Sequence, residues 1–171
     1  FSSAFANSLI NDFGVKKGDR IAIASRNYPE WIFSFIAITS IGAIAVPMNS
    51  WWTSKELEYG IEDSESKIII VDEERLNRIN SFYKKNNLKI VVIRPDNKNH
   101  KNNWTSYSKK YLSEKMPIFD INPVDDATIL YTSGSTGHPK GVCSSHKSII
   151  STLLQWMVVA TARNIKDDII T

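Results

Sequence analysis

Four short apolar runs, separated by segments long enough to form helices, constrain the fold of this chain more than any other feature. The runs are Arg20–Ser25, Ala43–Val46, Lys67–Val71 and Lys89–Ile93. Strands of a parallel sheet are covered by helices on both faces, so they are apolar throughout instead of alternating between apolar and polar residues. The sequence therefore predicts an α/β fold built from parallel βαβ units.

Helix signals occupy the segments between these runs. Gly14 is placed to end a first helix, and Pro29 suits the first turn of a second. Thr53 and Glu56 have the spacing of a capping box at the start of a third. Together with apolar periodicity, these signals predict helices over residues 2–13, 29–41, 54–63, 74–83 and 149–162. The last helix carries apolar residues along one side, so we expect it to pack against the rest of the fold.

Residues 31–54 carry no charged side chain, which makes a membrane-spanning helix an alternative for this stretch. Its 24 residues are enough to cross a bilayer. However, Gly42 and Pro47 fall where a helix should end and a strand should stop, which favours a helix followed by a strand. Trp51 and Trp52 could touch an acyl group or a membrane surface, but burial against neighbouring helices is favoured.

The composition is that of one ordinary soluble domain, since 42% of the 171 residues are apolar and 23% are charged. The single cysteine, Cys143, excludes an internal disulfide framework and a thiolate zinc cluster, and it favours a reducing compartment, the cytoplasm. Because Cys143 stands in an apolar run, we expect it in the core. Residues 1–20 lack the pattern of a secretory signal. Residues 167–170 look like the start of a new element, so we expect the chain to be part of a longer protein.

The net charge of +3 conceals two blocks of opposite sign. Residues 56–74 hold eight acidic side chains against Lys67 alone, and residues 84–115 hold nine basic ones against two acidic ones. A basic block can attract a polyanion or anionic lipid, although a solvated surface is its ordinary role. No aromatic or glycine pattern of RNA-binding modules accompanies it, so nucleic acid is not expected as a partner. Peripheral association with a membrane stays an alternative.

One loop is rich in the residue types that hold phosphate groups. Residues 132–137 are all Thr, Ser or Gly, and Lys140 follows shortly after. Small residues bring backbone N–H groups close to a ligand, hydroxyls add neutral donors, and a lysine adds positive charge. The spacing is neither that of the Walker P-loop nor that of the dinucleotide fingerprint. A flexible Ser/Gly connector is the alternative, but the apolar residues on both sides favour a short turn within the fold.

The loop and its flanking residues, YTSGSTGHPKGV over 131–142, resemble the signature loop of the adenylate-forming superfamily. This superfamily contains acyl-CoA synthetases, peptide-synthetase adenylation domains and luciferases. Four further stretches resemble the N-terminal region of its acid-CoA ligase branch: Gly14–Arg20, Asn27–Glu30, Gly42–Asn49 and Leu57–Ser66. The chain departs from the pattern at Ser144 and Ser145, which precede His146 where many relatives have a Thr-His pair.

The resemblance implies a fold, a reaction and a set of binding residues. Residues 1–171 would form the first part of the large N-terminal AMP-binding domain. Such enzymes convert a carboxylic acid, for example a fatty or related acid, and Mg-ATP into an acyl adenylate, and the acyl group then passes to coenzyme A. The phosphates of ATP and the departing pyrophosphate would contact Thr132, Ser133, Gly134, Ser135, Thr136, Gly137 and Lys140.

No catalytic residue and no ligand of the Mg²⁺ ion is assigned within this chain. His146 is expected to be structural, at the start of a helix, and His138 to face solvent. Two alternatives to a CoA ligase stay open. One is an adenylation domain that loads a carrier protein, and the other is a nucleotide-binding or membrane-associated fragment without catalytic activity.

Overall fold

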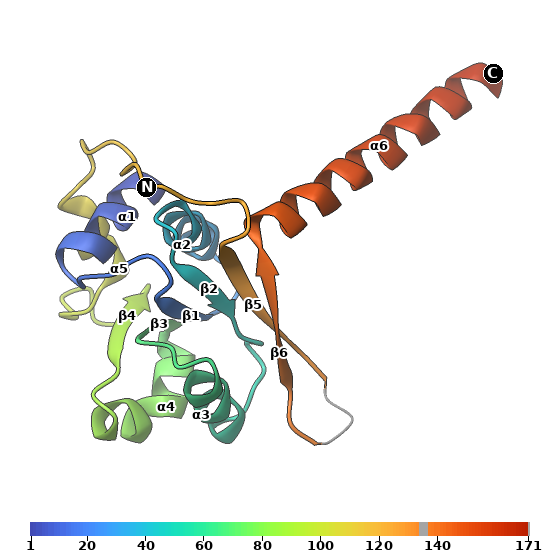
Figure 1. Ribbon diagram of the computed structural model, residues 1–171. Coiled ribbons are helices and arrows are strands. Elements are labelled where there is room, and N and C mark those ends of the chain that lie inside the picture. The colour runs from blue at the N-terminus through green and yellow to red at the C-terminus, as the bar shows by residue number, and fades with distance from the viewer. Residues whose placement is uncertain (134–136, 171) are drawn as a thin grey trace.

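The computed structural model describes residues 1–133 and 137–170, with residues 162–170 described as helical backbone only. Its centre is a six-stranded sheet in the order β4-β3-β1-β2-β5-β6 (Figure 1). The strands are β1 (Arg20–Ala24), β2 (Ile44–Pro47), β3 (Ile68–Asp72), β4 (Lys89–Ile93), β5 (Asp126–Thr132) and β6 (Lys140–Ser145). Neighbouring strands are parallel except β5 and β6, which form an antiparallel hairpin at one edge. The predicted α/β fold with parallel βαβ units is confirmed.

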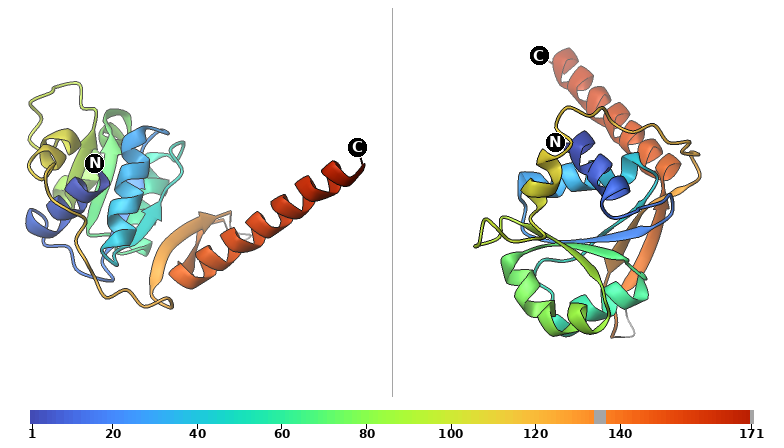
Figure 2. Two further views of the ribbon diagram at one scale, coloured as in Figure 1. Left: turned by 90° about the horizontal axis from the view of Figure 1, so that it is seen from above. Right: turned by 90° about the vertical axis from the view of Figure 1, so that its left-hand side faces the viewer.

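Helices cover the sheet on both faces. The helices are α1 (Ser2–Asn11), α2 (Pro29–Ser40), α3 (Ser54–Asp63), α4 (Glu73–Lys85), α5 (Trp104–Lys109) and α6 (His146–Ile170). Helices α1, α2 and α5 lie on one face, and α3 and α4 lie on the other (Figures 1 and 2). Successive residues of β1 show the consequence: Ile21 belongs to the first core and Ala22 to the second, and both are fully buried.

Local signals that predicted the helices are present in the structure. Gly14 adopts a φ of +70°, the left-handed conformation that ends a helix without a steric penalty. At α3 the Thr53 side chain accepts from the backbone N–H of Glu56, while the Glu56 carboxylate accepts from the backbone N–H of Thr53 at 2.7 Å. The uncharged stretch 31–54 contains α2 and β2. Across the described residues, no helix combines the length and the apolar character needed to cross a bilayer.

Helix α5 lies within the basic block and was not predicted. It is anchored by Trp104, which is 3% exposed and whose ring Nε1–H donates to the Ser34 hydroxyl at 2.8 Å. The Trp104 ring also packs against Phe5 of α1, with 5.1 Å between the ring centroids. Tyr107 of α5 packs on Phe13 as well, so aromatic side chains attach part of the basic block to the core.

Three predictions of burial are wrong, those for the last helix, for Cys143 and for Trp51. Helix α6 extends away from the sheet (Figures 1 and 2), and its Leu153 and Trp156 are 59% and 75% exposed. Cys143 is exposed as well, because β6 is the outermost strand of the sheet. Over α6 and over β6, the described part of the chain supplies no layer that covers the apolar side chains. Of the two adjacent tryptophans, Trp52 is buried as predicted, whereas Trp51 is 76% exposed.

Candidate functional site

Several segments meet where the parallel strands end, a side of the sheet called the carboxyl edge below. Arg26 follows β1, the connection 48–53 follows β2, Asp72 ends β3, and Thr132 ends β5. Open α/β sheets bind ligands outside this edge, because the connecting loops and the helix N-termini meet there. The Thr/Ser/Gly loop therefore leaves the sheet at the edge where a ligand site is expected.

The β5–β6 hairpin brings the two ends of this loop together. Thr132 pairs with Lys140 in the antiparallel register, so the two residues lie side by side where the loop begins and ends. Thr132, Ser133, Gly137 and Lys140 are all exposed to solvent. The other three predicted phosphate contacts, Gly134, Ser135 and Thr136, lie outside the described residues.

Gly137 has a backbone conformation that glycine tolerates and other residues rarely adopt. Its φ is +90°, and an added Cβ would have no atom of the described residues within 4 Å. The demand for glycine therefore comes from the backbone angle and not from crowding. Across residues 1–133 and 137–170, Lys140 forms no ion pair, so its charge is available to a ligand.

Both stems of the loop are attached to α3. The hydroxyl of Tyr131, one residue before Thr132, donates to Asp63 Oδ2 at 2.6 Å. On the other stem the Tyr59 hydroxyl lies 3.2 Å from the carbonyl oxygen of Pro139, and the Tyr59 ring stacks on His138 at 5.0 Å between centroids. His138 is thus exposed as expected, with one face of its ring against α3. Burial raises the pKa of Tyr131 well above its ordinary value, and the Asp63 carboxylate raises this pKa further.

A buried arginine fixes the connection between β2 and α3. Arg75 is 1% exposed and donates from Nη1 to Asp72 Oδ2 at 3.0 Å and from Nε to the carbonyl oxygen of Ser50 at 2.8 Å. Arg78 donates to the carbonyl oxygen of Trp52 at 2.6 Å. Sequence reasoning missed this arrangement, although an aspartate at the end of a strand with an arginine three residues later is a local signal that could have revealed it.

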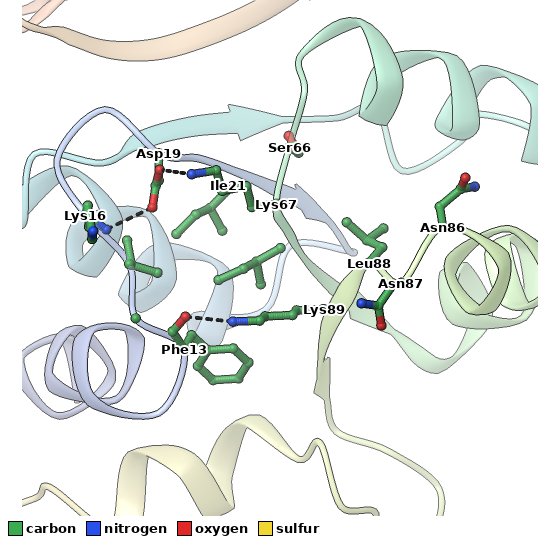
Figure 3. Close-up of a pocket in the computed structure, with 13 residues that line it drawn as sticks. Phe13, Lys16, Asp19, Ile21, Ser66, Lys67, Asn86, Asn87, Leu88 and Lys89 are labelled. Carbon is green, nitrogen blue, oxygen red and sulfur yellow. Dashed lines mark hydrogen bonds and ion pairs between the residues drawn. The ribbon is translucent and has the colours of Figure 1, made fainter.

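A separate pocket lies at the opposite end of the sheet, where the parallel strands begin. It has a volume of about 500 Å³ and is lined by the amino ends of β1, β3 and β4. Figure 3 shows the Lys89 ammonium bound to the carbonyl oxygen of Phe13, a contact of 2.8 Å, and Lys67 pairs with Asp19 at 2.6 Å. Lys67 and Lys89 are therefore already bound to groups of the same chain. The pocket is separate from the predicted phosphate site.

The two remaining candidate residues are His146 and Cys143. His146 begins α6, and its backbone N–H donates to the carbonyl oxygen of Asp125 at 3.1 Å. Partial desolvation and then the nearby Asp126 raise the pKa of Cys143 to about 11, so its thiol stays protonated at neutral pH. Within the described residues, no three His, Cys, Asp or Glu side chains are grouped so that they could hold a metal ion.

Comparison with known proteins places this geometry in a family. A family model described as AMP-binding enzyme matches residues 1–171, the whole chain. This chain belongs to the AMP-binding enzyme family. Membership of this family accounts for the signature loop and for the mostly parallel sheet that carries it.

Relatives within the family are CoA ligases that are much longer than this chain. The chain is 30% identical over 152 residues to 4-coumarate–CoA ligase 1 of Petroselinum crispum, with 86% of this chain and 27% of that protein covered. It is 29% identical over 164 residues to the long-chain-fatty-acid–CoA ligase FadD13 of Mycobacterium tuberculosis. That match covers 90% of this chain and 30% of FadD13. Among solved structures, ATP-bound MatB from Rhodopseudomonas palustris superposes with a TM-score of 0.78 at 29% identity, with 90% of this chain and 29% of that chain covered.

Proposed function

We propose that this chain is the first part of the AMP-binding domain of an acid-CoA ligase. The ligase would activate a carboxylic acid as an acyl adenylate with ATP and transfer the acyl group to coenzyme A. The observation that carries the proposal is the pairing of Thr132 with Lys140 at the carboxyl edge of the sheet. This pairing brings a hydroxyl and an ammonium group together within the family's signature loop.

The chemistry requires charge to be neutralised on a leaving group. A carboxylate oxygen attacks the α-phosphorus of ATP, a new O–P bond forms, and the bond from the α-phosphorus to pyrophosphate breaks. Fixed N–H donors, hydroxyls and a lysine stabilise the negative charge that accumulates on pyrophosphate. In this proposal Thr132, Ser133 and Lys140 supply such donors, and Gly137 allows the backbone to turn around the phosphates. Gly134, Ser135 and Thr136 are assigned the same role on the family resemblance alone.

Mg²⁺ would enter this site as the complex with ATP. The ion would reduce the charge repulsion between the carboxylate and the triphosphate. A cytoplasmic location, in keeping with the single cysteine, stays a prediction.

A fatty or related acid is proposed as the acid, with the relative FadD13 as support, because its name specifies long-chain fatty acids. The name of the Petroselinum crispum relative specifies 4-coumarate instead. The acid is therefore the part of the proposal that a direct assay must decide.

The test is acid-dependent exchange of labelled pyrophosphate into ATP by full-length protein, across a panel of fatty and aromatic acids. Exchange with at least one acid, followed by thioester formation with coenzyme A, is expected. Adenylate formation without thioester formation would favour a carrier protein as acceptor. Absence of exchange with every acid, from folded protein that binds Mg-ATP, would overturn the proposed reaction.

A further inference from the structure

Helix α3 presents two side chains that reach both stems of the signature loop. Tyr59 and Asp63 are four residues apart and therefore lie on the same face of α3. Asp63 accepts from Tyr131 on the stem before the loop, and Tyr59 contacts Pro139 on the stem after it. Figure 1 shows α3 beside the loop end of the β5–β6 hairpin.

The hydrogen bonds of these three side chains depend on one another. Each tyrosine hydroxyl has a single proton to donate, whereas a carboxylate accepts at both oxygens. Tyr131 uses its proton on Asp63 Oδ2, since the distance of 2.6 Å is that of a charge-assisted bond. Tyr59 lies 3.2 Å from the Pro139 carbonyl oxygen and 3.4 Å from Asp63 Oδ1, so it donates to one of them at a time. Asp63 is thus bound directly to the stem before the loop, and Tyr59 binds the stem after it when its proton lies on the Pro139 carbonyl oxygen.

The Tyr131 ring is held in place between Gly141 of β6 and the ring of Trp52. On β6, Gly141 is the register partner of Tyr131, and an added Cβ at Gly141 would lie 2.9 Å from Ile129 Cγ2 and 3.4 Å from Tyr131 Cζ. On the other side the ring meets Trp52 edge-on, with 5.5 Å between centroids. The absence of a side chain at Gly141 therefore allows the Tyr131 ring to lie where its hydroxyl reaches α3.

We propose that Tyr59, Asp63 and Tyr131 are positioning residues that hold the two stems of the signature loop at a fixed spacing, so that the loop's donors face the phosphates of ATP. This role rests on the proposed function. None of the three is assigned a contact with ATP, and each acts through Thr132, Lys140 and their neighbours. An unattached loop would have to be ordered by the ligand, which weakens binding and misplaces the donors.

The test uses Tyr131→Phe and Asp63→Ala in full-length protein, singly and together. Misplaced donors should lower kcat/KM for Mg-ATP in pyrophosphate exchange by roughly 10- to 100-fold. The KM for the acid and the rate of thioester formation from added acyl adenylate should stay unchanged, since neither depends on pyrophosphate contacts. The double variant should be no worse than the more damaging single variant, because the two substitutions break the same hydrogen bond.

Tyr111→Phe is the matched control. The Tyr111 hydroxyl donates to Asp12 at 3.3 Å, so the same kind of bond is removed far from the loop, and kcat/KM for Mg-ATP should not change. Tyr131→Phe keeps the ring and decides the question if Asp63→Ala fails to fold. An active Tyr131→Phe variant with wild-type kcat/KM for Mg-ATP would overturn the positioning role.

Hydrogen exchange separates this proposal from the proposed function. Without any ligand, backbone amides of residues 137–142 should exchange faster in Tyr131→Phe than in wild type, and at the wild-type rate in Tyr111→Phe. If wild-type protein shows no acid-dependent pyrophosphate exchange, the proposed reaction fails while this measurement still decides whether α3 holds the hairpin. Equal exchange rates in Tyr131→Phe and wild type would contradict the attachment itself.

Discussion

At the scale of single residues, a substitution of Gly137 changes the backbone conformation of the loop without changing its charge. Its φ of +90° means that alanine would be strained even though no atom of the described residues lies within 4 Å of the new Cβ. The cost is about 1–2 kcal/mol if the backbone keeps its conformation. If the loop instead relaxes, its donors move away from the phosphates. Gly137→Ala should therefore weaken binding of Mg-ATP, measured by calorimetry on full-length protein.

Gly14→Ala provides the control for this substitution. Gly14 has a φ of +70°, and an added Cβ there would also have no atom within 4 Å, but Gly14 ends α1 at the far edge of the sheet. Both variants should lose similar stability, and only Gly137→Ala should lose affinity for Mg-ATP. Equal affinity in the two variants would mean that the glycine serves the hairpin and not the nucleotide.

At the scale of secondary-structure elements, Arg75 ties α4 to the connection between β2 and α3. Substituting Arg75 with Met should destabilise the fold by about 3–5 kcal/mol, because the Asp72 carboxylate would stay buried without its partner. Arg78→Met is the comparison, since the Arg78 side chain is 25% exposed and its loss should cost less. Urea unfolding of full-length protein, followed by far-UV circular dichroism, measures both. A loss of stability no greater for Arg75→Met than for Arg78→Met would refute this account of the connection.

The elements also show what local sequence could and could not predict. Strands β1 to β4 were predictable because burial on both faces makes their inner residues uniformly apolar, as in Ile68–Val71. Helix α5 was missed because its buried anchor, Trp104, stands in a polar, lysine-rich segment. Cys143 was misplaced because an apolar run does not reveal that its strand is outermost.

In the candidate site, too, local sequence predicts some features and not others. The loop could be singled out from the sequence because its Thr, Ser and Gly residues are consecutive, as Thr132 and Ser133 illustrate, and phosphate binding by these residues stays a prediction. The attachment of Tyr131 to Asp63 was not predictable, because the two residues are 68 positions apart and meet only when β5 joins the sheet beside β2. Contacts of this kind follow from topology and not from a local pattern.

At the scale of the whole molecule, the exposed apolar side chains predict how residues 1–171 behave when expressed alone. Helix α6 exposes Leu153, Trp156 and Val158 by 59%, 75% and 69%, and the β5–β6 hairpin exposes Leu130 and Val142 by about half. Apolar surface of this kind promotes association. We expect aggregation in size-exclusion chromatography and no ligase activity. A monodisperse monomer with micromolar affinity for Mg-ATP would show that these residues form a self-sufficient domain.

Lys140→Ala in full-length protein tests whether the signature loop binds the departing pyrophosphate. Its ammonium group is the charge that the described loop residues supply, and loss of one charge-assisted contact costs roughly 1.5–3 kcal/mol. Acid-dependent pyrophosphate exchange should therefore fall about 10- to 150-fold. Lys147→Ala, an exposed lysine in the first turn of α6, should leave exchange unchanged. Wild-type exchange in Lys140→Ala would contradict the claim and remove Lys140 from the site.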